Sequence, residues 1–218
     1  MLALSRHVSR AVARIDPLRY KQEPAYVTAL FARLDGVVYR GRDLTLEFKS
    51  TIISDRAPGS AESVWGADFA IVASIRDEYN EVEKGVLGQA KRGSLDQLSR
   101  GDSSNFIRQV AKMNNATKAI VGLETPGGTV VMPTIRILEI PRMIGDIPLY
   151  SSVRHYDYVL KSHNNDEPAV FVGPAQPLAK YLGAELVRCL HGDTSEGFVK
   201  GLDNSDLSTL RIKARKIF

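Results

Sequence analysis

The sequence contains a single cysteine, Cys189, among 218 residues, so it holds neither a disulfide framework nor a zinc site built from cysteines. The four histidines are scattered and lack the spacing of a zinc site: His7, His155, His163 and His191. A Gly-Lys-Ser/Thr phosphate loop and a dinucleotide-binding fingerprint are both missing. These absences exclude disulfide-stabilised domains, cysteine-bound zinc folds, P-loop nucleotidases and Rossmann dehydrogenases.

Long apolar runs are also missing, and none reaches the length of a membrane-spanning helix. The hydrophobic fraction of 44% and the charged fraction of 25% are ordinary for a soluble globular protein. The formal net charge of +4 is compatible with a polyanionic partner but does not require one. The basic, acid-free residues 1–15 resemble a transit peptide, although a short amphipathic helix is the better interpretation. We therefore expect a cytoplasmic protein.

Hydrophobic periodicity predicts a single domain over residues 1–218, of α/β or α+β class, in which helices cover both faces of a mixed central β-sheet. The expected helices are 1–15, 25–34, 103–116 and 178–190, and the expected strands are 37–39, 44–53, 67–75, 86–91, 118–124 and 130–140. Pro133 favours an edge position for the last strand. Residues 139–218 are interpreted as a helical and irregular extension, ending in a basic cluster on an extended or fraying segment.

A predicted hairpin carries the polar residues of greatest interest. Asp68 stands at the head of an apolar, doubly buried strand, where only a partner or a metal would stabilise a carboxylate. Gln89 and Lys91 are two apart on the next strand and therefore share a face. Glu62 ends the long polar loop before the hairpin. Carboxylate and amide oxygens suit Mg²⁺, and a lysine beside them suits a phosphate, so the parts suffice for phosphodiester hydrolysis.

Each of these residues also has an ordinary structural interpretation. An aspartate at a strand start is usually a turn or capping residue, and a Gln-x-Lys pair is usually part of a solvated strand face. Trp65, just before the hairpin, is expected to pack beneath it, although base stacking is an alternative. The combination of the residues on one hairpin is what favours a functional site.

The strings Gly-Ala-Asp-Phe-Ala-Ile and Gly-Val-Leu-Gly-Gln-Ala-Lys-Arg, separated by a hairpin, resemble the PD-(D/E)xK nuclease superfamily. The resemblance is closest to Mrr-type members, which have glutamine in the second ligand position, and it covers about residues 17–138. It implies a restriction-endonuclease-like core in which Asp68, Gln89 and Glu62 bind Mg²⁺, with Mn²⁺ as a substitute, and Lys91 is the catalytic lysine. Glu23 could match a glutamate that some members carry on their first core helix. Ala67 replaces the proline of the motif.

The resemblance implies a metal-dependent DNA endonuclease in restriction or anti-phage defence, acting on double-stranded DNA in preference to single-stranded DNA. A homodimer or larger assembly, with other defence proteins as further partners, would supply the two sites needed to cut both strands. The rival interpretation is a non-catalytic nucleic-acid-binding or assembly subunit that retains the fold and binds DNA through its basic segments. An RNase on the same fold is a third alternative.

Overall fold

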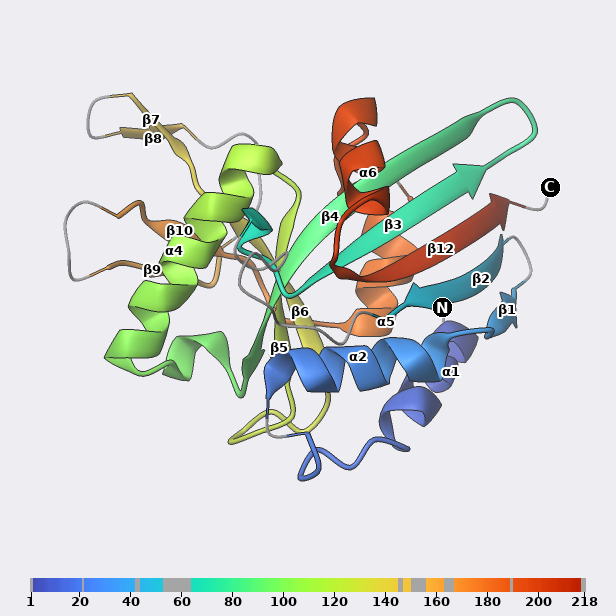
Figure 1. Ribbon diagram of the computed structural model, residues 1–218, viewed down its shortest axis with the longest axis horizontal. Coiled ribbons are helices and arrows are strands. Elements are labelled where there is room, and N and C mark those ends of the chain that lie inside the picture. The colour runs from blue at the N-terminus through green and yellow to red at the C-terminus, as the bar shows by residue number, and fades with distance from the viewer. Residues whose placement is uncertain are drawn as a thin grey trace.

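The computed structural model describes residues 2–20, 22–41, 44–52, 64–144, 147–149, 156–162, 167–188 and 190–216 (Figure 1). Its strands are β1 (Val38–Arg40), β2 (Leu44–Thr51), β3 (Phe69–Arg76), β4 (Glu81–Arg92), β5 (Ile120–Thr125), β6 (Thr134–Glu139), β7 (Arg142–Ile144), β8 (Ile147–Leu149), β9 (Tyr158–Leu160), β10 (Val170–Val172), β11 (Gln176–Pro177) and β12 (Ser208–Lys216). Ten of them form one mixed sheet in the order β1-β2-β12-β3-β4-β5-β6-β10-β9, with β11 paired to β6. Strands β7 and β8 form a separate pair.

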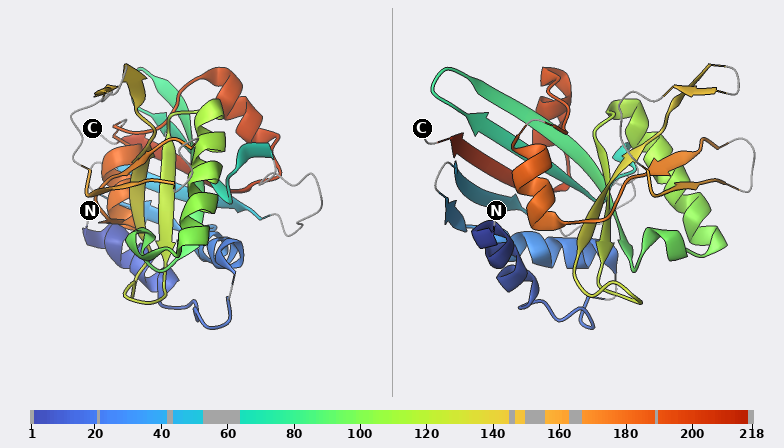
Figure 2. Two further views of the ribbon diagram at one scale, coloured as in Figure 1. Left: turned by 90° about the vertical axis from the view of Figure 1, so that its left-hand side faces the viewer. Right: turned by 180° about the vertical axis from the view of Figure 1, so that it is seen from behind.

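Helices lie on both faces of this sheet, which confirms the predicted α/β class (Figures 1 and 2). They are α1 (Leu2–Val12), α2 (Glu23–Leu34), α4 (Arg100–Ala116), α5 (Leu178–Lys180), the π-helical turn η2 (Tyr181–Leu186) and α6 (Glu196–Asp203), with a 3₁₀ turn η1 (Leu95–Gln97). One core joins α1, α2, α5 and η2 to the sheet, and a second core joins α4 and α6 to the opposite face. None of the described helices is long and apolar enough to span a bilayer.

The predicted hairpin is present as β3 and β4, and it is longer than expected. Asp77 closes the turn, because its Oδ1 accepts hydrogen bonds from the backbone N–H groups of Tyr79 (3.0 Å) and Asn80 (2.8 Å). The turn is therefore short, and β4 begins at Glu81 rather than at residue 86. The C-terminal part of β4, which carries Gln89 and Lys91, lies beside the start of β3.

The C-terminal strand β12 is the largest departure from the expected layout. The basic tail has the predicted extended conformation but does not fray: β12 lies between β2 and β3, antiparallel to the first and parallel to the second. Its even-numbered residues explain the placement, because Leu210, Ile212 and Ala214 are buried in the α1–α2 core. Basic residues alternate with these apolar residues along the strand, so the segment has the composition expected of a solvent-exposed tail although one of its faces is buried.

Smaller differences have local causes. Helix α4 starts at Arg100, three residues before the predicted start at 103, because the Ser99 hydroxyl accepts a hydrogen bond from the Asp102 N–H (3.2 Å). Strand β6 is not at an edge of the sheet, because it lies between β5 and β10. Pro133 is compatible with this interior position, since it precedes the first residue of the strand.

Candidate active site

The carboxylate of Asp68 is held at the head of β3 by the end of β4. Its Oδ2 accepts hydrogen bonds from the Gln89 side-chain Nε2 (2.5 Å) and from the Ala90 backbone N–H (2.9 Å). The Asp68 N–H donates to the Gly88 carbonyl (2.9 Å), which continues the pairing of the two strands. Asp68 and Gln89, 21 positions apart in sequence, are thus in direct contact, as expected if they face each other across a hairpin.

The segment before Asp68 is shaped by Gly66, whose φ of +71° is unfavourable for other residues. A Cβ atom there would also lie 2.7 Å from the Gln109 carbonyl oxygen, so glycine lets the segment pack against α4. Trp65, predicted to pack beneath the hairpin, lies edge-on against Phe198 of α6, with ring centroids 6.4 Å apart. Two helices therefore fix the approach of the chain to Asp68.

Gln89 is buried, with 2% of its surface exposed, and one of its amide atoms has no hydrogen bond. The amide donates through Nε2 to Asp68, which leaves Oε1 buried and without a partner. Leaving a buried acceptor unsatisfied costs on the order of 1–3 kcal/mol. Carboxylate and amide oxygens are ligands that suit Mg²⁺, and the Gln89 amide would have to turn its oxygen toward Asp68 for the two residues to hold a divalent cation together.

Lys91 lies on the same face of β4 as Gln89, because two positions separate them. It is half-buried, and its ammonium group forms no ion pair with any residue that the structure describes. The nearest candidate in the strand register is Glu124, which stands opposite Lys91 on the parallel strand β5. What Glu124 binds therefore decides whether the lysine is available.

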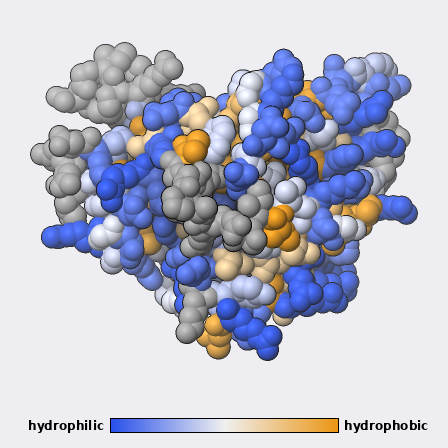
Figure 3. Space-filling view, viewed as in Figure 1, coloured by the Kyte–Doolittle hydropathy of each residue, from blue (hydrophilic) through white to orange (hydrophobic). Residues whose placement is uncertain are grey.

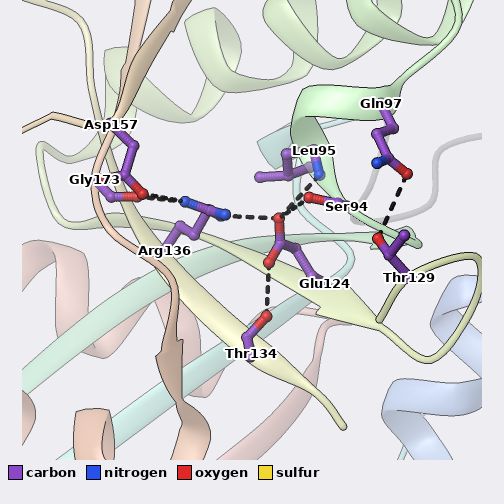
Figure 4. A network of polar contacts seen from close by, with 9 residues as sticks. All are labelled: Ser94, Leu95, Gln97, Glu124, Thr129, Thr134, Arg136, Asp157 and Gly173. Carbon is purple, nitrogen blue, oxygen red and sulfur yellow. Dashed lines mark hydrogen bonds and ion pairs between the residues drawn. The ribbon is translucent and has the colours of Figure 1, made fainter. Parts of the chain in front are cut away.

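Glu124 is buried and its two oxygens are engaged elsewhere (Figure 4). Oε1 accepts hydrogen bonds from Ser94 Oγ (3.1 Å), the Leu95 N–H (2.9 Å) and Arg136 Nε (2.8 Å). Oε2 accepts a hydrogen bond from Thr134 Oγ1 (2.6 Å). The network turns this carboxylate toward β6 and leaves Lys91 for a ligand.

Arg136 is the centre of that network on the β6 side. Its NH1 donates to Asp157 Oδ2 (2.9 Å) and to the Gly173 carbonyl (3.0 Å), and its guanidinium carbon lies 5.3 Å from the centre of the Tyr158 ring. Burial by itself lowers the pKa of Arg136, but the hydrogen bond to Glu124 and the surrounding charges raise it above its ordinary value. Burial also raises the pKa of the Tyr158 hydroxyl, against the opposing charge of Arg136.

The sequence reading missed Glu124 and Arg136, although both carry a usable signal. Each is a charged residue at an inward position of an apolar strand, and buried charges in proteins are almost always paired. Their ion pair adds little net stability, since desolvation offsets the attraction. Its contribution here is to occupy the carboxylate that would otherwise neutralise Lys91.

The remaining predicted ligands have different outcomes. Glu62 lies outside the described residues, as do His155, His163 and Cys189. Glu23, the first residue of α2, reaches the end of β4, where its Oε1 accepts a hydrogen bond from the Arg92 N–H (3.4 Å). Within the described part of the chain, no group of three or more histidine, cysteine, aspartate or glutamate residues is arranged to hold a metal. A cation at the hairpin would thus depend on the amide of Gln89 as well as on carboxylates.

No family model, curated protein or solved structure matches this chain. The chemistry of the hairpin has to be argued from its own residues.

Proposed function

We propose that the protein is a metal-dependent endonuclease that hydrolyses phosphodiester bonds in DNA, with its catalytic centre at Asp68, Gln89 and Lys91. The observation that carries the proposal is the buried Oε1 of Gln89, unpartnered and part of an amide that contacts the Asp68 carboxylate. Lys91, on the same face and without an ion pair in the described part of the chain, supplies the cation that a phosphate needs. The motif resemblance and restriction or anti-phage defence are part of the same proposal.

In this proposal Asp68 and Gln89 hold Mg²⁺ or Mn²⁺, with Glu62 as a further ligand. A bound divalent ion polarises a phosphoryl oxygen of the substrate and makes a neighbouring water a stronger acid. Lys91 orients the attacking water and offsets the negative charge that develops on the phosphate. The Ala90 N–H fixes the orientation of the Asp68 carboxylate throughout, since it is a backbone donor within the sheet.

Cutting both strands of a duplex requires two such centres, so we expect the active form to be a homodimer or a larger assembly, with other defence proteins as further partners. We expect it to act in the cytoplasm, where Mg²⁺ and duplex DNA are both present.

The test is a cleavage assay on double- and single-stranded DNA and RNA, with and without Mg²⁺. Asp68→Ala and Lys91→Ala should each lower Mg²⁺-dependent cleavage of DNA by at least about a hundredfold, because each removes charge stabilisation at the reacting phosphate. Asp206→Ala and Lys161→Ala are the matched controls, since both side chains are exposed and form no interaction within the described residues. Equal cleavage by the wild type and both site variants would refute the proposal.

The rival function is a non-catalytic subunit that binds nucleic acid through its basic surface. The orphaned Gln89 oxygen disfavours it, because a relic site has no reason to retain that cost. Calorimetric titration separates the two functions: Mg²⁺ or Mn²⁺ binding that is lost in Asp68→Ala supports the nuclease, and no metal binding by the wild type supports the subunit.

A further inference from the structure

On one face of the sheet, the described helices do not reach the side chains at the turn end of the hairpin, which are exposed. Helix α6 packs on this face at Gly85, where a Cβ atom would lie 2.5 Å from Leu202 Cδ1, and the turn end of β3 and β4 continues beyond it (Figure 1). The side chains of Arg76, Lys213 and Arg215 are exposed there. The space-filling view shows a largely hydrophilic surface over this part of the hairpin and β12 (Figure 3).

The strand registers place like charges next to one another on this face. Arg215 of β12 stands directly opposite Arg76 of β3. Lys213 lies two positions before Arg215 in β12 and therefore on the same face of the sheet. Arg40 of β1 lies in the same cross-strand row as Arg215 and Arg76, because it pairs with Thr45, which in turn pairs with Arg215. Like charges directly opposite each other in a sheet are destabilising. We name Arg76, Lys213 and Arg215 the basic stripe.

Carboxylates offset this repulsion in part, because Glu47 stands opposite Lys213 and Glu81 opposite Arg76 in the strand registers. None of the three cations of the basic stripe forms an ion pair within the described part of the chain. Glu81 instead accepts a hydrogen bond from Ser74 Oγ (3.2 Å), and Glu47 pairs with Lys49 (3.5 Å). The carboxylates beside the stripe are thus engaged with other groups.

A depression of about 610 Å³ lies over the stripe, lined by its three cations together with Glu47, Ser74 and Glu81. The carboxylates flank it on both sides, since Glu47 belongs to β2 and Glu81 to β4. A broad polyanionic surface would meet these carboxylates and be repelled, whereas a single phosphate backbone could follow the line of β12 and β3. Charge complementarity therefore selects a narrow anionic chain.

We infer that the basic stripe binds the phosphate backbone of a nucleic-acid strand, as a second anchor separate from the candidate active site. The inference rests on the proposed function for the identity of the ligand as nucleic acid. Strand β4 runs from Glu81 beside the depression to Lys91 at the candidate centre, a span of about 30 Å at ~3.3 Å per residue. The stripe therefore holds substrate without taking part in the chemistry.

The test measures binding of labelled single- and double-stranded DNA in EDTA, at salt concentrations from about 50 to about 200 mM. The double variant Arg76→Ser with Arg215→Ser should weaken binding of single-stranded DNA about tenfold and reduce the slope of log affinity against log salt by about two. The matched control is Arg33→Ser with Arg188→Ser, which removes the same charge from exposed positions outside the basic stripe and the basic N-terminal segment. The control should stay within about twofold of the wild type. Thermal unfolding of each variant establishes that the fold is intact.

Unchanged affinity in the stripe variant would overturn the inference, and so would equal losses in the stripe and control variants, which would indicate net charge alone. Competition by polyglutamate as effective as competition by DNA would also overturn it, because it would indicate an acidic polypeptide as the partner. Failure of the proposed function has a different readout. If Asp68→Ala cleaves as the wild type does while the stripe variant loses binding, the active site is wrong and the anchor stands.

Discussion

Gln89 is buried and donates a hydrogen bond to Asp68, whereas Asp68 and Lys91 are only half-buried. An acidic residue in place of Gln89 would bring a second carboxylate against Asp68 Oδ2. The glutamine thus avoids repulsion between two carboxylates, while it would offer a cation one negative charge fewer. If the proposed function is right, metal affinity and the stability of the metal-free protein are coupled through this one position.

The variant Gln89→Glu makes that coupling measurable. In EDTA the free energy of unfolding should fall by about 1–3 kcal/mol, because a hydrogen bond is replaced by repulsion between two carboxylates. Mg²⁺ should restore stability to the variant more than to the wild type, since the added charge favours the cation. Urea unfolding with and without Mg²⁺ provides the measurement, and an equal response to Mg²⁺ in both proteins would contradict it.

Asp193 gives a second prediction at the residue scale. Burial by itself raises the pKa of this carboxyl, but hydrogen bonds from Ser195 (N 2.9 Å, Oγ 2.5 Å) and Thr117 (Oγ1 2.7 Å) hold the pKa below its ordinary value of 3.8. A lowered pKa in the folded state contributes stability that is complete above the unfolded-state pKa and is lost as the pH falls below it. Asp193 is thus expected to stabilise the protein at neutral pH and less so in acid.

The variant Asp193→Asn should therefore be less stable than the wild type at about pH 6, with the difference shrinking by about pH 3. Urea unfolding at the two pH values checks this, and Asp206→Asn, at an exposed position, is the control. A difference that grew toward low pH would contradict the assigned direction.

Among single residues, the sequence could place Asp68, Gln89 and Lys91 because strand alternation and one short hairpin are local relations. It could not show that Glu124 turns away from Lys91, since that depends on Arg136 from a third strand. Long-range pairing of charges leaves only a weak local signal.

At the scale of elements, the two strands of the β3–β4 hairpin pack closely where a phenylalanine on one strand stands opposite a glycine on the other. Phe69 stands opposite Gly88 in the register, and a Cβ atom on Gly88 would lie 2.0 Å from Phe69 Cζ. The ring therefore lies across the backbone of β4, and also meets Phe31 of α2 at a centroid distance of 5.7 Å. Helix α2 and both strands of the hairpin share this contact.

Gly88→Ala should lower the free energy of unfolding by about 1–3 kcal/mol through overpacking. The double variant with Phe69→Leu should lose less than the sum of the two single variants, because the shorter side chain relieves the clash. Gly101→Ala is the control: a Cβ atom in that position of α4 meets nothing within 4 Å, so the substitution should be neutral or stabilising by roughly 0.5–1 kcal/mol. Urea unfolding of the wild type, the two single variants, the double variant and the control gives the comparison, and additivity would contradict the contact.

At the scale of the whole molecule, β12 holds two parts of the sheet together, since β2 is joined to β3 only through it in the strand order. Ile212→Ala should therefore cost about 2–5 kcal/mol, the usual loss for a buried aliphatic side chain. Lys213→Ala, one position further on the exposed face, should change stability by no more than about 0.5 kcal/mol. Similar losses in both variants, measured by urea unfolding, would contradict the interior position of the strand.

The fold class and the order of the elements from α2 to β5 were predictable, because the helices and strands between them show clear hydrophobic periodicity. The insertion of β12 was not, since hydrophobic alternation identifies a strand but not its neighbours. Strands β9 and β10 escaped for a different reason: three residues each are too few to show a period.

The position of β12 also sets an order of events during biosynthesis. Strand β3 ends at Arg76, whereas β12 begins at Ser208, so the ribosome completes both neighbours of the gap long before the strand that fills it. Until then β2 and β3 expose open hydrogen-bonding edges, the kind of surface on which nascent chains aggregate. Asp68, at the head of β3, thus lies beside a strand edge that is paired only after residue 208 has been synthesised, which delays assembly of the candidate site until β12 has been made.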